Sequence, residues 1–197
     1  MHIVYVSDGK AGHRSQAAGL YQAVQRISRQ SVTFQEISIE QLPLLTLVTG
    51  IISGELKALE QAPDYILGVG SHTQLRVLLL GNAYPQAKTV ILMKPNFPVA
   101  WFDYSIIPEH DAVPESEKVI VTQGALNPIV NEQRHQPNRI LIALGGPSKR
   151  HAWNDAKVLN AIQQIAESNL QAEIILTTSR RTPKGFLEQL RAQPFAG

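Results

Sequence analysis

The chain has 197 residues, of which 44% are hydrophobic and 17% charged, and its formal net charge is +2. This composition predicts a folded protein with a hydrophobic core, and the lack of cysteine excludes disulfides, thiolate metal sites and cysteine nucleophiles. The sequence has no dense basic stripe, no apolar run near the ~20 residues of a membrane-spanning helix and no secretory signal, so we expect a cytoplasmic protein without a nucleic-acid partner.

In chain order, eight short apolar or β-branched runs predict strands: Ile3–Val6, Val32–Ile37, Tyr65–Val69, Thr89–Met93, Tyr104–Ile107, Val119–Thr122, Ile140–Leu144 and Glu173–Thr177. Several are continuous, as in a parallel sheet that is buried on both faces. Between them, apolar residues recur at helical spacing, at positions 17, 20, 21, 24 and 27 and again at 158, 159, 162, 165 and 166. The predicted fold class is therefore α/β, with a Rossmann-like parallel sheet and the start of a second one.

The polar segment from Asn127 to Asn138 contains two prolines and predicts a linker. We expect a first Rossmann-like domain over residues 1–126, a linker over 127–137 and a partial second Rossmann-like domain over 138–197. The last part has room for β-α-β-α only, so we expect a truncated protein or a domain that needs a partner surface. A homodimer that completes the small second sheet is the alternative.

The strongest site candidate is the loop after the first predicted strand, Ser7-Asp8-Gly9-Lys10-Ala11-Gly12-His13. Gly9 and Gly12 let the backbone approach a ligand, Lys10 and His13 supply donors to a phosphate or carbonyl, and Gln16 lies one turn beyond. Ligands of open α/β sheets bind at the carboxyl ends of strands, which favours a binding site over an ordinary turn with surface charge. Neither a Walker A loop nor a dinucleotide fingerprint occurs, so no cofactor is expected.

A second loop of this kind follows the strand at 65–69. Gly70 permits close approach, and Ser71, His72 and Thr73 offer donors and a general base. The alternative is that Ser71 or Thr73 only caps a helix.

Candidate site residues also follow two further predicted strands. Lys94 follows the strand at 89–93 as a further ligand contact. Glu109 and His110 follow the strand at 104–107 as a candidate acid/base pair, with a loop salt bridge as the alternative. Consecutive side chains diverge, so we do not expect these two and Asp111 to bind one metal ion.

The second domain has its own candidate anion site. From residue 137 onward the chain has eight Lys or Arg against four Asp or Glu, which favours a phosphorylated ligand. A glycine-bearing loop presents Gly145, Gly146, Ser148 and Lys149, and the last strand ends in Ser179, Arg180 and Arg181. Arginine forks suit phosphate oxygens, although a solvated charge pair is the alternative. Thr182 is the expected N-cap of the last helix and Pro183 its first residue.

Together these blocks resemble the plant mitochondrial fission factor family and its bacterial relatives. The matching stretches are Asp8-Gly9-Lys10-Ala11-Gly12-His13 with Gln16, Phe102-Asp103 with Pro108-Glu109-His110-Asp111, Gly124-Ala125-Leu126, Gly145-Gly146 and Thr178-Ser179-Arg180-Arg181-Thr182-Pro183. The resemblance implies a GT-B glycosyltransferase, in which two Rossmann-like domains face a cleft and the second holds a nucleotide sugar. The loops at 9–13 and 145–148 also look like those of the peptidoglycan lipid-linked N-acetylglucosaminyl transferase.

The hypothesis that follows is a metal-independent, nucleotide-sugar-dependent glycosyltransferase or its N-terminal portion. The donor diphosphate would contact the loop at 145–149, with Arg180 or Arg181 neutralising the leaving group, and the acceptor would lie against Gly12, His13 and Ser71. His13 is the first candidate base and the Glu109–His110 pair the second. The alternative is a non-catalytic scaffold that binds a phosphorylated ligand or a partner protein. Members of the plant family are named for membrane division, which leaves peripheral membrane contact open.

Overall fold

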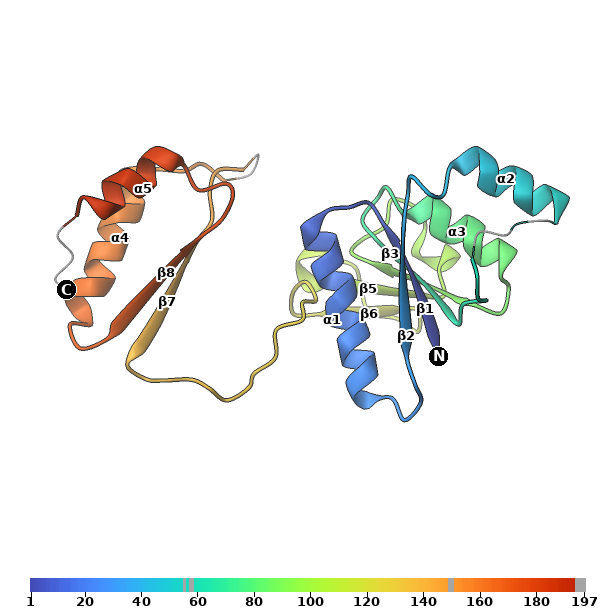
Figure 1. The fold of residues 1–197 in the computed structure, drawn as a ribbon, viewed down its shortest axis with the longest axis horizontal. Coiled ribbons are helices and arrows are strands. Elements are labelled where there is room, and N and C mark those ends of the chain that lie inside the picture. The colour runs from blue at the N-terminus through green and yellow to red at the C-terminus, as the bar shows by residue number, and fades with distance from the viewer. Residues whose placement is uncertain (55, 57–58, 149–150, 194–197) are drawn as a thin grey trace. The chain divides into compact units, whose positions relative to one another are not determined.

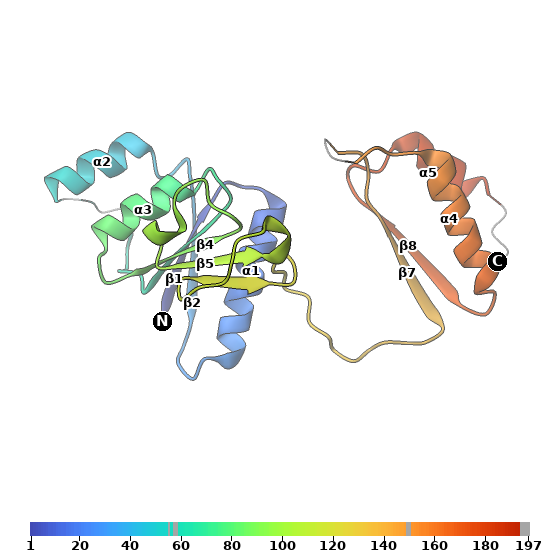
Figure 2. The same cartoon turned by 180° about the vertical axis from the view of Figure 1, so that it is seen from behind.

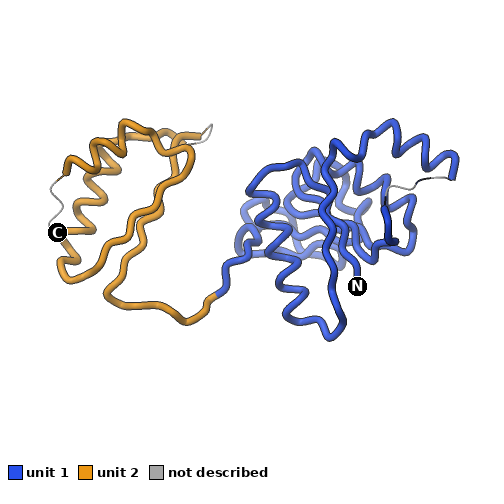
Figure 3. The backbone as a smooth tube through the Cα atoms, viewed as in Figure 1, with its two compact units in different colours: residues 1–130 blue, residues 131–197 orange. Residues whose placement is uncertain are grey.

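The computed structural model describes residues 1–54, 56, 59–148 and 151–193. The chain divides into two compact units, Met1–Val130 and Asn131–Gly197 (Figure 3). Each unit has its own sheet, and each is described by itself. In the described part of the chain, no helix combines the length and the apolar character needed to cross a membrane.

The first unit is built on a six-stranded sheet in the order β2-β1-β3-β4-β5-β6 (Figure 1). The strands are β1 (His2–Ser7), β2 (Thr33–Ser38), β3 (Tyr65–Val69), β4 (Lys88–Leu92), β5 (Tyr104–Pro108) and β6 (Val119–Thr122). All five ladders are parallel. The predicted α/β class with a Rossmann-like sheet is confirmed, and each strand lies within one residue of its predicted bounds.

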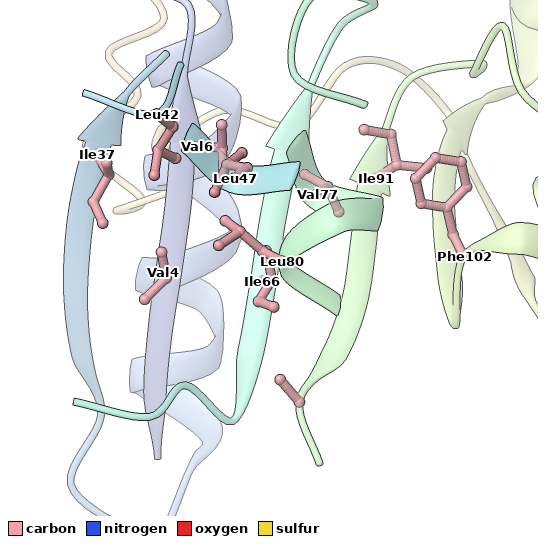
Figure 4. Packing of buried hydrophobic residues seen from close by; sticks show 11 residues of the cluster. Val4, Val6, Ile37, Leu42, Leu47, Ile66, Val77, Leu80, Ile91 and Phe102 are labelled. Carbon is pink, nitrogen blue, oxygen red and sulfur yellow. The ribbon is translucent and has the colours of Figure 1, made fainter. Parts of the chain in front are cut away.

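Helices cover both faces of this sheet (Figures 1 and 2). On one face, α1 (Ala11–Ile27) packs its Ala17 against β1, β3 and β4. On the other, α2 (Leu44–Ser53) and α3 (Gln74–Ala83) bury Leu47, Val77 and Leu80 (Figure 4). Two short 3₁₀ turns, η1 (Val99–Trp101) and η2 (Glu109–Asp111), flank β5. Burial on both faces explains why the strands are nearly continuous apolar runs.

In the sheet, β1 lies between β2 and β3. In the sequence, β2 lies between β1 and β3. The chain therefore leaves the carboxyl ends of β1 and β3 toward opposite faces, into α1 and α3 respectively. In open α/β sheets, such a switch point leaves a crevice between two loops where ligands bind.

The second unit is smaller. Its sheet pairs β7 (Arg139–Leu144) with β8 (Glu173–Thr178) in parallel, and α4 (Asp155–Ser168) and α5 (Lys184–Arg191) lie on one side of the pair (Figure 1). Ile162 and Phe186 are its buried apolar side chains. The register partners Leu141 and Ile175 are 65% and 41% exposed, so the other side of this sheet is open.

No helix or strand occurs between β6 and β7, over residues 123–138. The first part of this stretch belongs to the first unit. Leu126 packs against the core cluster under α1, and a β-carbon on Gly19 of that helix would stand 2.5 Å from the backbone carbon of Asn127. Asn127, where the predicted linker begins, therefore lies against α1.

Candidate functional site

The loop between β1 and α1, with the first turn of that helix, brings the polar side chains of Ser7, Asp8, Lys10 and His13 to the switch point. Gly9 has a φ of 75°, in the left-handed region that glycine adopts without strain, and its N–H donates to Ser7 Oγ at 3.2 Å. Lys10 occupies the N-cap of α1, so Gly12 and His13 lie in its first turn. A β-carbon on Gly12 would meet nothing within 4 Å, which leaves the mouth of the loop open.

Asp8 lies at the centre of this loop, with a side chain only 3% exposed. Its Oδ1 lies 2.8 Å from His13 Nδ1, and its Oδ2 lies 2.8 Å from Lys10 Nζ in an ion pair. Burial alone raises the pKa of Asp8, but the bonds to Lys10 and His13 outweigh it and hold this pKa below its ordinary value. Asp8 is therefore a buried carboxylate that holds two partners.

The second loop of the site meets His13 through a glycine. Gly70 follows β3 with a φ of 78°, and a β-carbon there would overlap Cε1 of the His13 ring. The close approach that Gly70 permits is thus made by His13, from a loop more than fifty residues away in the sequence. Through this contact, the loop after β3 packs against the start of the helix that follows β1.

The other predicted residues of the second loop differ in exposure. Ser71 and His72 are exposed beside Gly70. Thr73 is fully buried at the N-cap of α3, and its hydroxyl bonds back to the Gly70 carbonyl oxygen at 3.0 Å. Thr73 therefore holds the turn at the N-cap of α3, which is the alternative considered from the sequence, and its hydroxyl donates within the turn.

A third loop, after β4, is tied to the first by Gln16. This side chain is buried and donates from Nε2 to Met93 Sδ at 3.6 Å. Lys94 lies further along the carboxyl edge of the sheet, where it is bound to Asp111. Its backbone N–H donates to Asp111 Oδ2 at 3.3 Å, and its Nζ donates to the Asp111 carbonyl oxygen at 3.4 Å. Gln16 thus ties α1 to the loop after β4, whereas Lys94 is bound to Asp111 after β5.

The predicted acid/base pair Glu109–His110 lies apart from this cluster. Both residues are exposed in η2 after β5, and β3 and β4 separate that strand from β1. His110 Nε2 is 3.9 Å from Asp111 Oδ1, so its ion-pair partner is Asp111, as in the loop salt bridge considered above. Among the described residues, no group of His, Asp or Glu side chains could hold a metal ion.

The loops of the second unit interlock. A β-carbon on Gly146 would overlap the backbone carbonyl of Arg181, so only glycine lets the two loops touch here. The buried Thr182 hydroxyl lies 2.5 Å from the Gly145 carbonyl oxygen and accepts from the Ser179 N–H at 3.0 Å. Arg180 and Arg181 are both exposed at the end of this loop pair. The predicted residues Gly145, Gly146, Ser179 and Arg181 are thus brought together.

The helices of this unit begin some residues after their glycine and arginine loops. Beyond Gly146 the chain turns through Ser148, whose N–H donates to the His151 carbonyl oxygen at 2.9 Å, and α4 begins after Asn154. The Asn154 side chain accepts from the Lys157 N–H and caps this helix, which contains the predicted helical positions 158–166. Thr182 is not the N-cap of α5, because its hydroxyl holds the loops together, and Pro183 takes that position. Lys149 lies outside the described residues.

Asp8 organises the first loop, although no role was predicted for it from the sequence. An acidic residue beside a glycine and five positions before a histidine is a usable signal for such a role. A half-open hollow of about 250 Å³ lies elsewhere, beside α1, and its apolar lining includes Leu20, Tyr65 and Ile106. Its lining holds no charged side chain, so the chemistry points to the Asp8–His13 cluster instead.

Comparisons with known proteins agree with the motifs. The family model described as mitochondrial fission ELM1 matches residues 11–195. The chain is 24% identical over 234 aligned residues to the uncharacterised protein RP120 of Rickettsia prowazekii (strain Madrid E), an alignment that covers 93% of this chain. It covers 66% of the relative, so the chain spans just under two thirds of that protein's length.

Proposed function

The chain belongs to the mitochondrial fission ELM1 family, as its motifs predicted, and we propose that it serves in transfer of a sugar from a nucleotide sugar to a hydroxyl acceptor. The observation that carries this proposal is the buried Asp8 carboxylate bonded to His13 at the switch point of the first sheet. A carboxylate paired with an imidazole is typical of acid/base chemistry, and the switch point is where such folds bind ligands.

In the proposed reaction, the bond between the sugar's anomeric carbon and the diphosphate oxygen breaks, and its electron pair leaves with the diphosphate. The acceptor oxygen forms the new bond to that carbon. Its proton passes to His13, which the first unit holds at a loop that is open above Gly12. Ser71 and His72 are the exposed polar side chains beside it that would contact the acceptor.

The donor is assigned to the second unit. A leaving diphosphate gains negative charge, which nearby cations and backbone N–H groups stabilise. Arg180 and Arg181 supply such cations from an exposed loop, and Gly145 has open space where a side chain would stand. The excess of basic residues after position 137 supports the same assignment.

The first test is nucleotide binding followed by turnover. A panel of nucleoside diphosphates and nucleotide sugars is screened by thermal shift on the 197-residue chain, since a ligand of the native state raises the melting temperature. The variant Arg180→Gln with Arg181→Gln should lose the shift. With a binding sugar nucleotide, release of nucleoside diphosphate is then measured for His13→Gln, which should lower it about 10²-fold or more. His135→Gln, at an exposed histidine outside the helices and strands, is the matched control and should not lower the release.

Either of two results would overturn the proposal. One is turnover by His13→Gln equal to that of the unmodified chain. The other is the absence of both a thermal shift and turnover with every nucleotide sugar. The second result, with a partner protein or a non-nucleotide phosphate compound bound instead, would favour the non-catalytic scaffold.

A further inference from the structure

Asp8 shares its two carboxylate oxygens between two partners from the start of α1. Oδ1 lies 2.8 Å from His13 Nδ1 and accepts from the Lys10 backbone N–H at 3.3 Å. Oδ2 lies 2.8 Å from Lys10 Nζ. Lys10 is 55% exposed, whereas the Asp8 side chain is 3% exposed. The contact of Asp8 with His13 is therefore more shielded from solvent than its contact with Lys10.

This arrangement decides which ring nitrogen of His13 carries the hydrogen. An ionised carboxylate only accepts hydrogen bonds, so the nitrogen that faces Asp8 must donate. That nitrogen is Nδ1, which leaves the lone pair of the neutral ring on Nε2. Within the described residues, no hydrogen-bond partner of Nε2 is found.

The ring is held on a second side as well. Its Cε1, the carbon between the two nitrogens, packs against Gly70, where any β-carbon would overlap it. A hydrogen bond at Nδ1 and a contact at Cε1 fix both the tilt and the rotation of the imidazole. The direction of Nε2 is thus set by the loops of β1 and β3 together.

We propose that Asp8 is a positioning residue that keeps His13 in the Nδ1–H form and reserves Nε2 as its proton acceptor. Lys10 compensates the buried carboxylate charge and does not select the nitrogen. The catalytic meaning of that acceptor rests on the function proposed above, whereas the placement of the hydrogen does not.

The test is ¹⁵N nuclear magnetic resonance of the histidine rings at about pH 8.5, where an ordinary imidazole is neutral. The His13→Gln spectrum identifies the His13 signals by their loss. The unmodified chain should show hydrogen on Nδ1. Asp8→Ala removes the acceptor, and the Nδ1–H form should no longer be the dominant one.

Two further variants separate charge from hydrogen bonding. Lys10→Met removes one charge from the same cluster and should keep the Nδ1–H form. Asp8→Asn combined with Lys10→Met removes both charges, but its amide oxygen still accepts from His13 and from the Lys10-position N–H, so this variant should also keep it. Dispersed amide signals in each spectrum check that the variant is folded.

The proposal fails if Asp8→Ala retains the Nδ1–H form or if Lys10→Met loses it. Where a sugar nucleotide is turned over, Asp8→Ala should lower turnover about 10²-fold or more without weakening nucleotide binding. Absence of both nucleotide binding and turnover in the unmodified chain would refute the proposed function and leave the ring measurement valid. The two failures are therefore distinguishable.

Discussion

The imidazole of His13 lies against Gly70 so closely that a β-carbon on the glycine would overlap the ring. The two residues belong to different loops, after β1 and after β3. Gly70 also has a φ of 78°, so two separate demands, backbone conformation and space, require glycine at this position.

The substitution Gly70→Ala should therefore be costly in two ways. The positive φ alone costs an alanine about 1–2 kcal/mol. The overlap with His13 adds about 1–3 kcal/mol or displaces the ring. The matched control is Gly54→Ala, since Gly54 has a φ of 70° but open space around the same position. Urea unfolding should place Gly70→Ala at least about 1 kcal/mol below the control, and equal stabilities would show that His13 does not pack there.

In the second unit, Gly146→Ala should separate the two interlocked loops. Its β-carbon would overlap the Arg181 backbone, which costs about 1–3 kcal/mol by overpacking. Gly145→Ala, with nothing within 4 Å of the new carbon, is the control and should be near neutral. The measurement is the fluorescence of Trp153, which packs edge-on against Phe186, during denaturation in a Trp101→Phe background. An unchanged midpoint for Gly146→Ala would contradict the loop contact.

A third prediction concerns acid stability and Asp103. Burial alone raises the pKa of this carboxyl, but hydrogen bonds from the Thr89 N–H and hydroxyl, both 2.9 Å, and from Lys88 lower it overall. Because the folded pKa is depressed, the stabilisation is present above the unfolded value of about 3.9 and is lost as pH falls through the folded one.

The variant Asp103→Asn should accordingly lose about 1–2 kcal/mol of unfolding free energy at pH 7, and the loss should shrink below about pH 4. Urea unfolding at a series of pH values measures both effects. Glu115→Gln, at an exposed acidic residue, is the control and should track the unmodified chain. A loss at pH 7 that persists undiminished in acid would show that the carboxylate charge is not responsible.

The strands were the most predictable part of the fold. A parallel strand that is buried on both faces must be apolar at nearly every position, and that pattern is visible in a single sequence. Helix α2 (Leu44–Ser53) was not predicted, although Thr46, Thr49 and Ser53 recur at helical spacing and give it a polar, exposed face. Only Leu47 is buried, whereas Leu45 and Ile52 are 76% and 81% exposed, so tertiary packing decides which side faces in.

The site was predictable loop by loop but not as an assembly. Residues such as Lys10 and His13 could be found because polar donors follow a strand end. The pairing of His13 with Gly70 could not, since it depends on β1 lying beside β3, and strand order is not written in local patterns. The start of α4 was readable in principle, because Asn154 is a standard N-cap residue that directly precedes the predicted helical pattern.

The contact between Gly19 and Asn127 has a practical meaning for anyone who wants to divide this chain. Cutting at Thr122, where β6 ends, would remove Leu126 from the core cluster and the backbone that lies on α1. Cutting after Val130 keeps both with the first unit. Inserted tags, fusion partners and protease sites therefore belong in residues 131–135, which lie outside the helices and strands and before the backbone of Asn138 that bonds to Glu173 of β8.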